Sequence, residues 1–166
     1  MPEDRRPITN LIPAVLENVT YFECPPLRFS VERRVLSPDI ISAQYASVHD
    51  GAKPPETWLK SDGGGTLHIE APFDDQLWTE HLRFDCFADQ PHYHYLCPAE
   101  GWHERYAYDE VANGPMIPWV LRTLGNSLIA MLGQCKAAHS VISRVDQDRV
   151  AATLREIEQA WVLVTA

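Results

Sequence analysis

The spacing of apolar residues changes its period near residue 109, and this change restricts the fold more than any other feature of the chain. Before it, four segments alternate apolar and polar side chains, as β-strands with one buried face do. These segments are residues 66–71, 82–87, 92–97 and 102–108. After it, apolar residues recur at steps of three and four over 117–135 and 150–161, which predicts two amphipathic helices. Strands followed by helices predict an α+β fold: an antiparallel meander of four to six strands packed against two C-terminal α-helices.

Shorter patterns extend this prediction. Residues 29–36 alternate in the same way and predict another strand. Ser37, Pro38 and Asp39 combine a hydroxyl cap, a proline and an acid, which favours the start of a helix. The residues that follow are also β-rich in composition, so a strand competes with that helix. Asp146 is a good N-cap for the second C-terminal helix.

The distribution of proline sets the expected domain division. The chain has 166 residues and 13 prolines, and eight of these prolines precede residue 56. Proline lacks a backbone N–H group and interrupts helices and sheets, so a proline-rich stretch favours extended, irregular structure. We therefore predict an irregular N-terminal extension over residues 1–28 and a single α+β domain over residues 29–166, a length at which one hydrophobic core suffices.

Charge and hydropathy narrow the expected partners. Acidic residues outnumber basic ones 23 to 14, which gives a formal net charge of -9. An acidic surface repels phosphate backbones and anionic bilayers, so neither a nucleic acid nor a membrane is an expected partner. No apolar run is long enough to span a membrane, and the N-terminus lacks the apolar core of a signal peptide. These observations predict a cytoplasmic protein.

The densest group of side chains with ligand chemistry lies on a predicted hairpin, residues 82–98. A four-residue connection over residues 88–91 would pair Asp85 with His94. Alternation then places one set of side chains toward the helices and another set on the opposite face. The helix-facing set is Leu82, Phe84, Cys86, Tyr93, Tyr95 and Cys97, and the polar set is Arg83, Asp85, Phe87, His92 and His94. The polar face is the candidate site.

A divalent metal ion is the first ligand that this face could bind. His92 and His94 point the same way from one strand, about 7 Å apart. Either Asp85 or Glu70 would supply a carboxylate as the third ligand. Imidazole and carboxylate ligands with open positions suit Zn, Fe or Mn. His68, on a neighbouring strand, is available to assist.

The same side chains could also act without a metal. A carboxylate beside His94 would raise the pKa of that histidine and orient its ring for acid–base catalysis. The candidate catalytic residues are then His94, Asp85 and Arg83, with His103 as a further candidate. A solvated or structurally hydrogen-bonded face without function is the alternative, because the polar side of an antiparallel sheet commonly faces water.

Known motifs are missing from the hairpin, but one resemblance is present. The cupin pattern requires a glycine ahead of its His-x-His, where this chain has Cys86. The runs Arg83-Phe84-Asp85-Cys86-Phe87 and Pro91-His92-Tyr93-His94-Tyr95 resemble the signature of an uncharacterised bacterial family, a domain of unknown function. The resemblance covers residues 66–160 and implies a soluble bacterial protein, with no activity, cofactor or catalytic residue attached to it.

Two classes of function stay open at this point. The first is a soluble protein that binds a small molecule or a divalent metal, and that could be an enzyme, through its cluster of His, Asp and Arg side chains. The second is a non-catalytic interaction module or accessory subunit, for which a homodimer is one form. The expected partner is accordingly a small-molecule ligand or a second copy of the chain.

Overall fold

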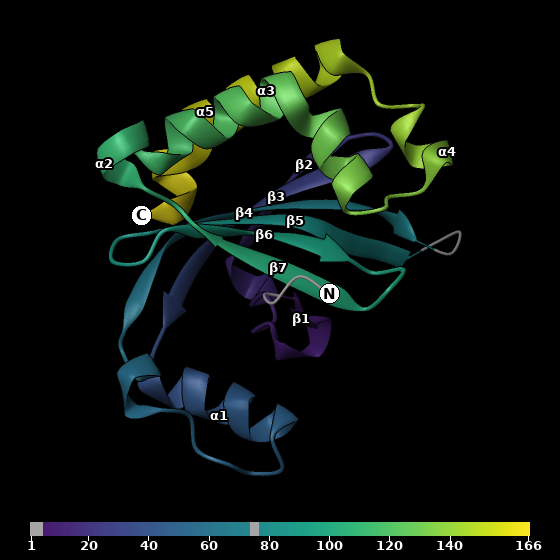
Figure 1. Cartoon of the computed structure of the whole chain (residues 1–166). Coiled ribbons are helices and arrows are strands. Elements are labelled where there is room, and N and C mark those ends of the chain that lie inside the picture. Colours follow the sequence, from purple (N-terminus) through teal and green to yellow (C-terminus); the bar gives the residue numbers. More distant parts are fainter. Residues whose placement is uncertain (1–4, 74–76) are drawn as a thin grey trace.

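Seven antiparallel strands form one sheet in the computed structural model, which describes residues 5–73 and 77–166. The strands are β1 (Arg5–Pro7), β2 (Val19–Cys24), β3 (Leu27–Leu36), β4 (Asp62–Phe73), β5 (Leu77–Phe87), β6 (His92–Cys97) and β7 (Trp102–Ala107). Their order across the sheet is β1-β7-β6-β5-β4-β3-β2, so the chain meanders from β2 to β7 and β1 lies at the β7 edge (Figure 1). The predicted antiparallel meander is confirmed, with seven strands instead of four to six.

The two additional strands come from the N-terminal segment. β1 pairs with β7, with Arg5 opposite Glu104, and β2 pairs with β3 along its whole length. Between β1 and β2 the chain makes two short 3₁₀ turns, Ile8–Asn10 and Leu16–Asn18. The sheet therefore includes parts of residues 1–28, where the proline content predicts irregular structure.

Two long helices cover one face of the sheet, as predicted (Figure 1). They are α3 (Met116–Gln134) and α5 (Gln147–Thr165), preceded by the short helices α2 (Glu110–Asn113) and α4 (His139–Ile142). Asp146 caps α5 by accepting hydrogen bonds from the backbone N–H groups of Asp148 and Arg149. The apolar sides of both long helices meet apolar side chains of β3, β4 and β5 in the core. No helix within residues 5–73 and 77–166 is long and apolar enough to cross a membrane.

Helix α1 (Pro38–Val48) lies on the other side of the sheet, beyond the ends of β3 and β4 (Figure 1). The side chain of Ser37 accepts a hydrogen bond from the backbone N–H of Ile40, and Asp39 adds an acid to the first turn. These capping interactions favour the helix over the strand with which it competes in the sequence.

Residues 8–18, here called the N-terminal cover, lie against the polar side of the sheet. The carbonyl oxygen of Ile12 accepts hydrogen bonds from Arg34, at 2.6 Å, and from Arg83, at 3.0 Å. The backbone N–H of Val15 donates to the carboxylate of Glu32, at 2.9 Å. Three polar side chains of the sheet thus hold this segment in place.

The hairpin of β5 and β6 differs from the prediction in its register. Asp85 pairs with His92 and Arg83 pairs with His94, so the predicted pair of Asp85 with His94 is wrong. The end of β5 extends past β6 and pairs only with β4. The shift amounts to two residues, and an even shift leaves every side chain on its predicted face.

Candidate metal centre

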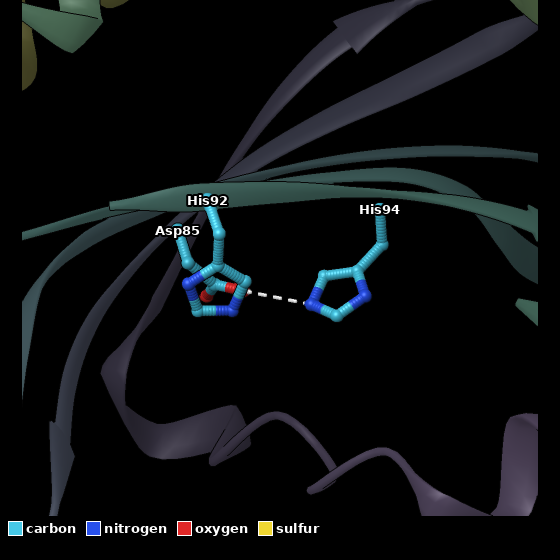
Figure 2. Close-up of side chains that lie close together, drawn as sticks. All are labelled: Asp85, His92 and His94. Atoms are coloured by element: carbon cyan, nitrogen blue, oxygen red, sulfur yellow. Dashed lines mark ion pairs between the residues drawn. The ribbon is translucent and has the colours of Figure 1, made fainter. Parts of the chain in front are cut away.

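Asp85 on β5 and His92 and His94 on β6 form one compact set, here called the ligand group (Figure 2). Each side chain offers one ligand atom, and these atoms all lie within 4.8 Å of one another. The Nε2 atoms of His92 and His94 are 3.2 Å and 3.5 Å from Oδ2 of Asp85. The register explains this closeness, because Asp85 and His92 are directly opposite and His94 lies two residues farther along the same face. All three side chains point away from the strands toward the N-terminal segment.

The ligand group is buried, so a solvated polar face is wrong, and a structurally hydrogen-bonded face stays the alternative to a functional site. Asp85 and His94 are 3% and 4% exposed, and the side chain of His92 is 11% exposed. Residues 10–12 of the N-terminal cover line the same cavity as these side chains. Burying polar groups costs free energy unless they are hydrogen-bonded or ligated. The burial of three ligand-type side chains together therefore needs an explanation.

Asp85 carries a negative charge in the folded chain. Burial alone would raise the pKa of its carboxyl group, but hydrogen bonds from His92 and His94 and the charge of Arg83 hold that pKa well below its usual range. Its other oxygen, Oδ1, accepts a hydrogen bond of 2.7 Å from the hydroxyl of Thr66 on β4. Thr66 thus fixes one oxygen of an ionised carboxylate and leaves the other toward the histidines.

His94 is a neutral imidazole at pH 7. Burial lowers its pKa to about 4, against the opposing effect of Asp85. The expectation that Asp85 raises the pKa of His94 above its ordinary value is therefore wrong, because removal from water disfavours the charged ring more than one carboxylate favours it. Neutral imidazole is the form that binds metal ions.

The ring of His103, on β7, contacts the ring of His94. The Nδ1 atoms of the two rings are 3.2 Å apart, so one ring donates a hydrogen bond and the other accepts it. Burial and the neighbouring His94 lower the pKa of His103 to about 4. Its Nε2 atom is buried and has no hydrogen-bond partner within residues 5–73 and 77–166. Because the ring of His103 hydrogen-bonds to Nδ1 of His94, Nε2 of His94 is free to face Asp85.

A second set of charged side chains lies beside the ligand group and is satisfied within the protein. Arg83 donates to Glu80 through Nε and Nη2, at 2.8 Å and 2.7 Å. The ring of His68 lies between Glu80 and Glu32, with nitrogen–oxygen distances of 2.5 Å and 3.0 Å. Arg34 donates to Glu32 at 3.0 Å. These side chains balance one another's charges and hold the N-terminal cover.

The structure brings some of the predicted site residues into the ligand group and leaves others outside it. His92, His94 and Asp85 come together as the ligand group. Arg83 lines the same cavity, but its guanidinium also bonds to Glu80 and to a backbone carbonyl, so it has a structural role. Glu70 lies outside the group, because its carboxylate pairs with Arg28 at 2.8 Å.

Sequence reasoning missed three of the charged residues in this second set. Glu32 and Arg34 alternate with the core residues of β3, so period-two counting places them on the polar face, but it does not show that this face is covered. Glu80 lies on β5 three residues before Arg83, ahead of the predicted start of that strand. A β-bulge near Glu70 also alters the pairing of β4 with β5 there, which simple alternation cannot indicate.

Two adjoining cavities open beside the ligand group. The cavity whose wall includes Asp85, His94 and His103 has a volume of about 170 Å³ and is here called the inner cavity. The outer cavity has a volume of about 330 Å³. The two share the lining residues Arg6, Leu36, Phe87, His92 and Arg105. The two cavities are therefore neighbours, and His92 of the ligand group lines both.

Comparison with known proteins assigns the chain to a family. Residues 21–161 match the model of a domain of unknown function, DUF7700. The chain belongs to this family. The resemblance to an uncharacterised domain family is thereby confirmed. The DUF7700 region runs from β2 into α5 and contains the whole ligand group, whereas the N-terminal cover precedes it. No curated protein and no solved structure matches the chain.

Proposed function

We propose that this chain binds one divalent transition-metal ion through Asp85, His92 and His94. The observation that carries the proposal is the clustering of three buried ligand atoms within 4.8 Å of one another. Atoms bound at about 2.1 Å from one ion in tetrahedral geometry lie roughly 3.4 Å apart. The distances from Oδ2 of Asp85 to the two histidines, 3.2 Å and 3.5 Å, are close to that value.

Protonation and support of the ligands favour the same function. Metal ions bind ionised carboxylates and neutral imidazoles, and the pKa shifts of Asp85 and His94 favour these forms at pH 7. Metal ligands are commonly oriented by hydrogen bonds to neighbouring groups. Thr66 on Asp85 and His103 on His94 are suited to that role.

The chemistry of such a site follows from its ligands. Two histidines and one carboxylate with open positions suit Zn, Fe or Mn. The inner cavity adjoins the ligand group, so the open positions would be accessible to a small molecule. A bound ion would polarise an oxygen of that molecule or lower the pKa of a bound water. In its stronger form, the proposal is that the chain is an enzyme that uses this chemistry.

Titration of metal-free protein with Zn²⁺ and Co²⁺ tests the proposal. We expect calorimetry to show one equivalent of Zn²⁺ bound, and Co²⁺ to give an absorption spectrum typical of nitrogen and oxygen ligands. His92→Ala, His94→Ala and Asp85→Asn should each weaken Zn²⁺ binding by at least about tenfold. His139→Ala, which removes an exposed histidine on α4, is the matched control and should bind like wild type. Absent binding, or unchanged binding in both His92 and His94 variants, would contradict the proposal.

Self-association is a second candidate function with one observation in its favour. Val162 and Leu163, near the end of α5, are 74% and 82% exposed. Neighbouring exposed apolar side chains are typical of contacts between proteins. Light scattering would detect a homodimer, which Leu163→Glu should convert to monomer. A wild-type monomer across the concentration range would exclude this candidate.

A further inference from the structure

Two arginines lie where the inner and outer cavities meet. Arg6 on β1 is opposite His103, and Arg105 on β7 is opposite His94. Residues directly opposite one another in a sheet share a face, so both arginines belong to the polar side, beside the ligand group. Both contribute to the walls of both cavities.

The charges of these two arginines are not used by the fold. Within residues 5–73 and 77–166, neither side chain forms an ion pair or a side-chain hydrogen bond, whereas Arg34 and Arg83 pair with Glu32 and Glu80. Both are exposed and accessible to a ligand. Arg105 is two residues along β7 from His103, the residue opposite Arg6, so the two cations are diagonal neighbours on one face. The two like charges are therefore close enough to repel each other, and an anion between them would relieve the repulsion.

The wall of the outer cavity has an apolar part. Leu36, Ile41, Trp58 and Phe87 line this cavity together with the two arginines. Its volume of about 330 Å³ is at the lower end of the range typical of small-molecule sites, roughly 300–1,000 Å³. An apolar wall next to a pair of cations suits a molecule with an apolar body and an anionic group.

The carboxylate of Asp62 also lines the outer cavity and could oppose an anion there. Both of its oxygens accept hydrogen bonds from backbone N–H groups: Oδ1 from Gly63 and Asp89, and Oδ2 from Gln90. These bonds hold its charge at the base of the β5–β6 connection. Lys60 and the second carboxylate, Asp89, also line this cavity, so its wall carries three cations against two carboxylates, and two of the three cations are Arg6 and Arg105.

The inner cavity adds an independent sign of a ligand. His103 is 4% exposed and lines this cavity, and its buried Nε2 has no partner within residues 5–73 and 77–166. A buried ring nitrogen without a partner is costly. A polar group of a ligand in the inner cavity could satisfy it.

We propose that the two cavities form a binding site for a small organic carboxylate with an apolar body. Arg6 and Arg105 hold the carboxylate, and Trp58 and Phe87 contact the body. The planar guanidinium groups match the geometry of a carboxylate. A simple inorganic anion would leave the apolar wall uncovered. The site depends on the arginines and the cavities and does not require a bound ion, so it goes beyond the metal-binding proposal.

Calorimetric titration of the full chain with phenylacetate tests this inference, in EDTA and again with Zn²⁺. We expect phenylacetate to bind, while its uncharged analogue 2-phenylethanol and inorganic phosphate bind at least about tenfold more weakly. Arg6→Gln and Arg105→Gln should each weaken phenylacetate binding about tenfold or more, because each removes a charged hydrogen-bond donor. Arg155→Gln changes an exposed arginine on α5 by the same one charge and should bind like wild type.

The other outcomes of these titrations either overturn or support the carboxylate site. Absent phenylacetate binding at millimolar concentration, equal binding of the alcohol or of phosphate, or equal weakening by Arg155→Gln would overturn the inference. Arg105→Lys keeps the charge but not the planar fork, so its intermediate affinity supports carboxylate recognition even if Arg105→Gln folds poorly. Phenylacetate binding in EDTA by a protein that takes up no Zn²⁺ would support this site and contradict only the metal-binding proposal.

Discussion

Asp85 is held by three neighbours, which makes the orientation of its carboxylate sensitive to single changes. Thr66 donates to Oδ1, and the two histidines of the ligand group face Oδ2. We expect Thr66→Val, which keeps the shape of the side chain, to weaken Zn²⁺ binding by about 10- to 100-fold, because the carboxylate loses its support. Calorimetry measures this change. Thr153→Val alters an equally buried threonine on α5 and should leave Zn²⁺ affinity unchanged. Wild-type affinity in Thr66→Val would show that Thr66 does not orient Asp85.

The buried ring of His68 lies between two carboxylates, which favour its protonated form. Burial would lower its pKa, but the charge of Glu80 and hydrogen bonds with Glu32 and Glu80 outweigh burial and raise it above 6.5. Below pH 6.5 both the folded and the unfolded chain carry this proton, so the stabilisation by His68 is complete. As the pH rises, the unfolded chain loses the proton first. The stabilisation then falls by up to about 1.4 kcal/mol per pH unit until the pH reaches the folded pKa.

We therefore expect the free energy of unfolding to decline above pH 6.5 more steeply in wild type than in His68→Gln. Urea unfolding at pH values from about 6 to about 9 gives both curves. At the acid end of that range, His68→Gln should be less stable by about 3–5 kcal/mol, because the buried Glu32 and the partly exposed Glu80 lose their shared cation. His139→Gln serves as the control and should follow wild type. Parallel curves for wild type and His68→Gln would contradict the assigned charge of His68.

At the scale of elements, alternation and helical periodicity predicted most of the fold, but not what covers the polar face. The strands β3 to β7 and the helices α3 and α5 lie where the sequence places them. The cover over the ligand group is a stretch without periodicity, residues 8–18, and its main attachment is the backbone carbonyl of Ile12. A backbone group carries no signal in the sequence. The same pattern was therefore compatible with a solvated face and with a buried site.

The register of the β5–β6 hairpin shows a second limit of local reasoning. Asp62 on β4 accepts hydrogen bonds from the backbone N–H groups of Asp89 and Gln90 in the connection. A partner 27 residues away thus contributes to the shape of the connection. Because the predicted register differs from the observed one by two residues, every side chain stays on its predicted face. The prediction therefore places Asp85, His92 and His94 on one face despite the wrong pairing. A shift of one residue would have turned His92 and His94 toward the helices.

The contact of α5 with the sheet depends on the missing side chain of Gly65. A Cβ atom there would lie 2.3 Å from Cζ2 of Trp161 and 2.5 Å from Cγ2 of Thr165, both on α5. We expect Gly65→Ala to lower the free energy of unfolding by about 1–3 kcal/mol, since the side chains of Trp161 and Thr165 must move from their packed positions. Gly133→Ala is the matched control: no atom lies within 4 Å of its added Cβ, and alanine favours helix α3 by up to about 1 kcal/mol. Urea unfolding should give opposite signs, and equal signs would contradict the assigned packing.

At the scale of the whole molecule, a bound ion should stabilise the fold, because the ligand group joins two strands beneath the N-terminal cover. Zn²⁺ at 100 times its dissociation constant adds about 2.7 kcal/mol to the stability of a chain that binds it only when folded. For a chain of this size that corresponds to a rise in Tm of roughly 5–11 °C. Thermal unfolding with Zn²⁺ and with EDTA measures the rise, which Asp85→Asn should abolish. An equal rise in Asp85→Asn would place the ion elsewhere on the protein.

β1 pairs with β7, so the sheet cannot be completed until the last of its strands has been synthesised. Arg5 on β1 bonds to Glu104 on β7, 99 residues later. At about 5–20 residues per second, ribosomal synthesis separates these partners by roughly 5–20 seconds. During that interval β5 and β6 are synthesised and their side chains are exposed to solvent. β1 cannot yet pair, because its partner strand β7 has not been synthesised. For the proposed metal site, we expect the metals available around the nascent chain to decide which ion binds. Comparing the metal content of protein purified from cells with that of protein refolded in a defined metal mixture would show this influence.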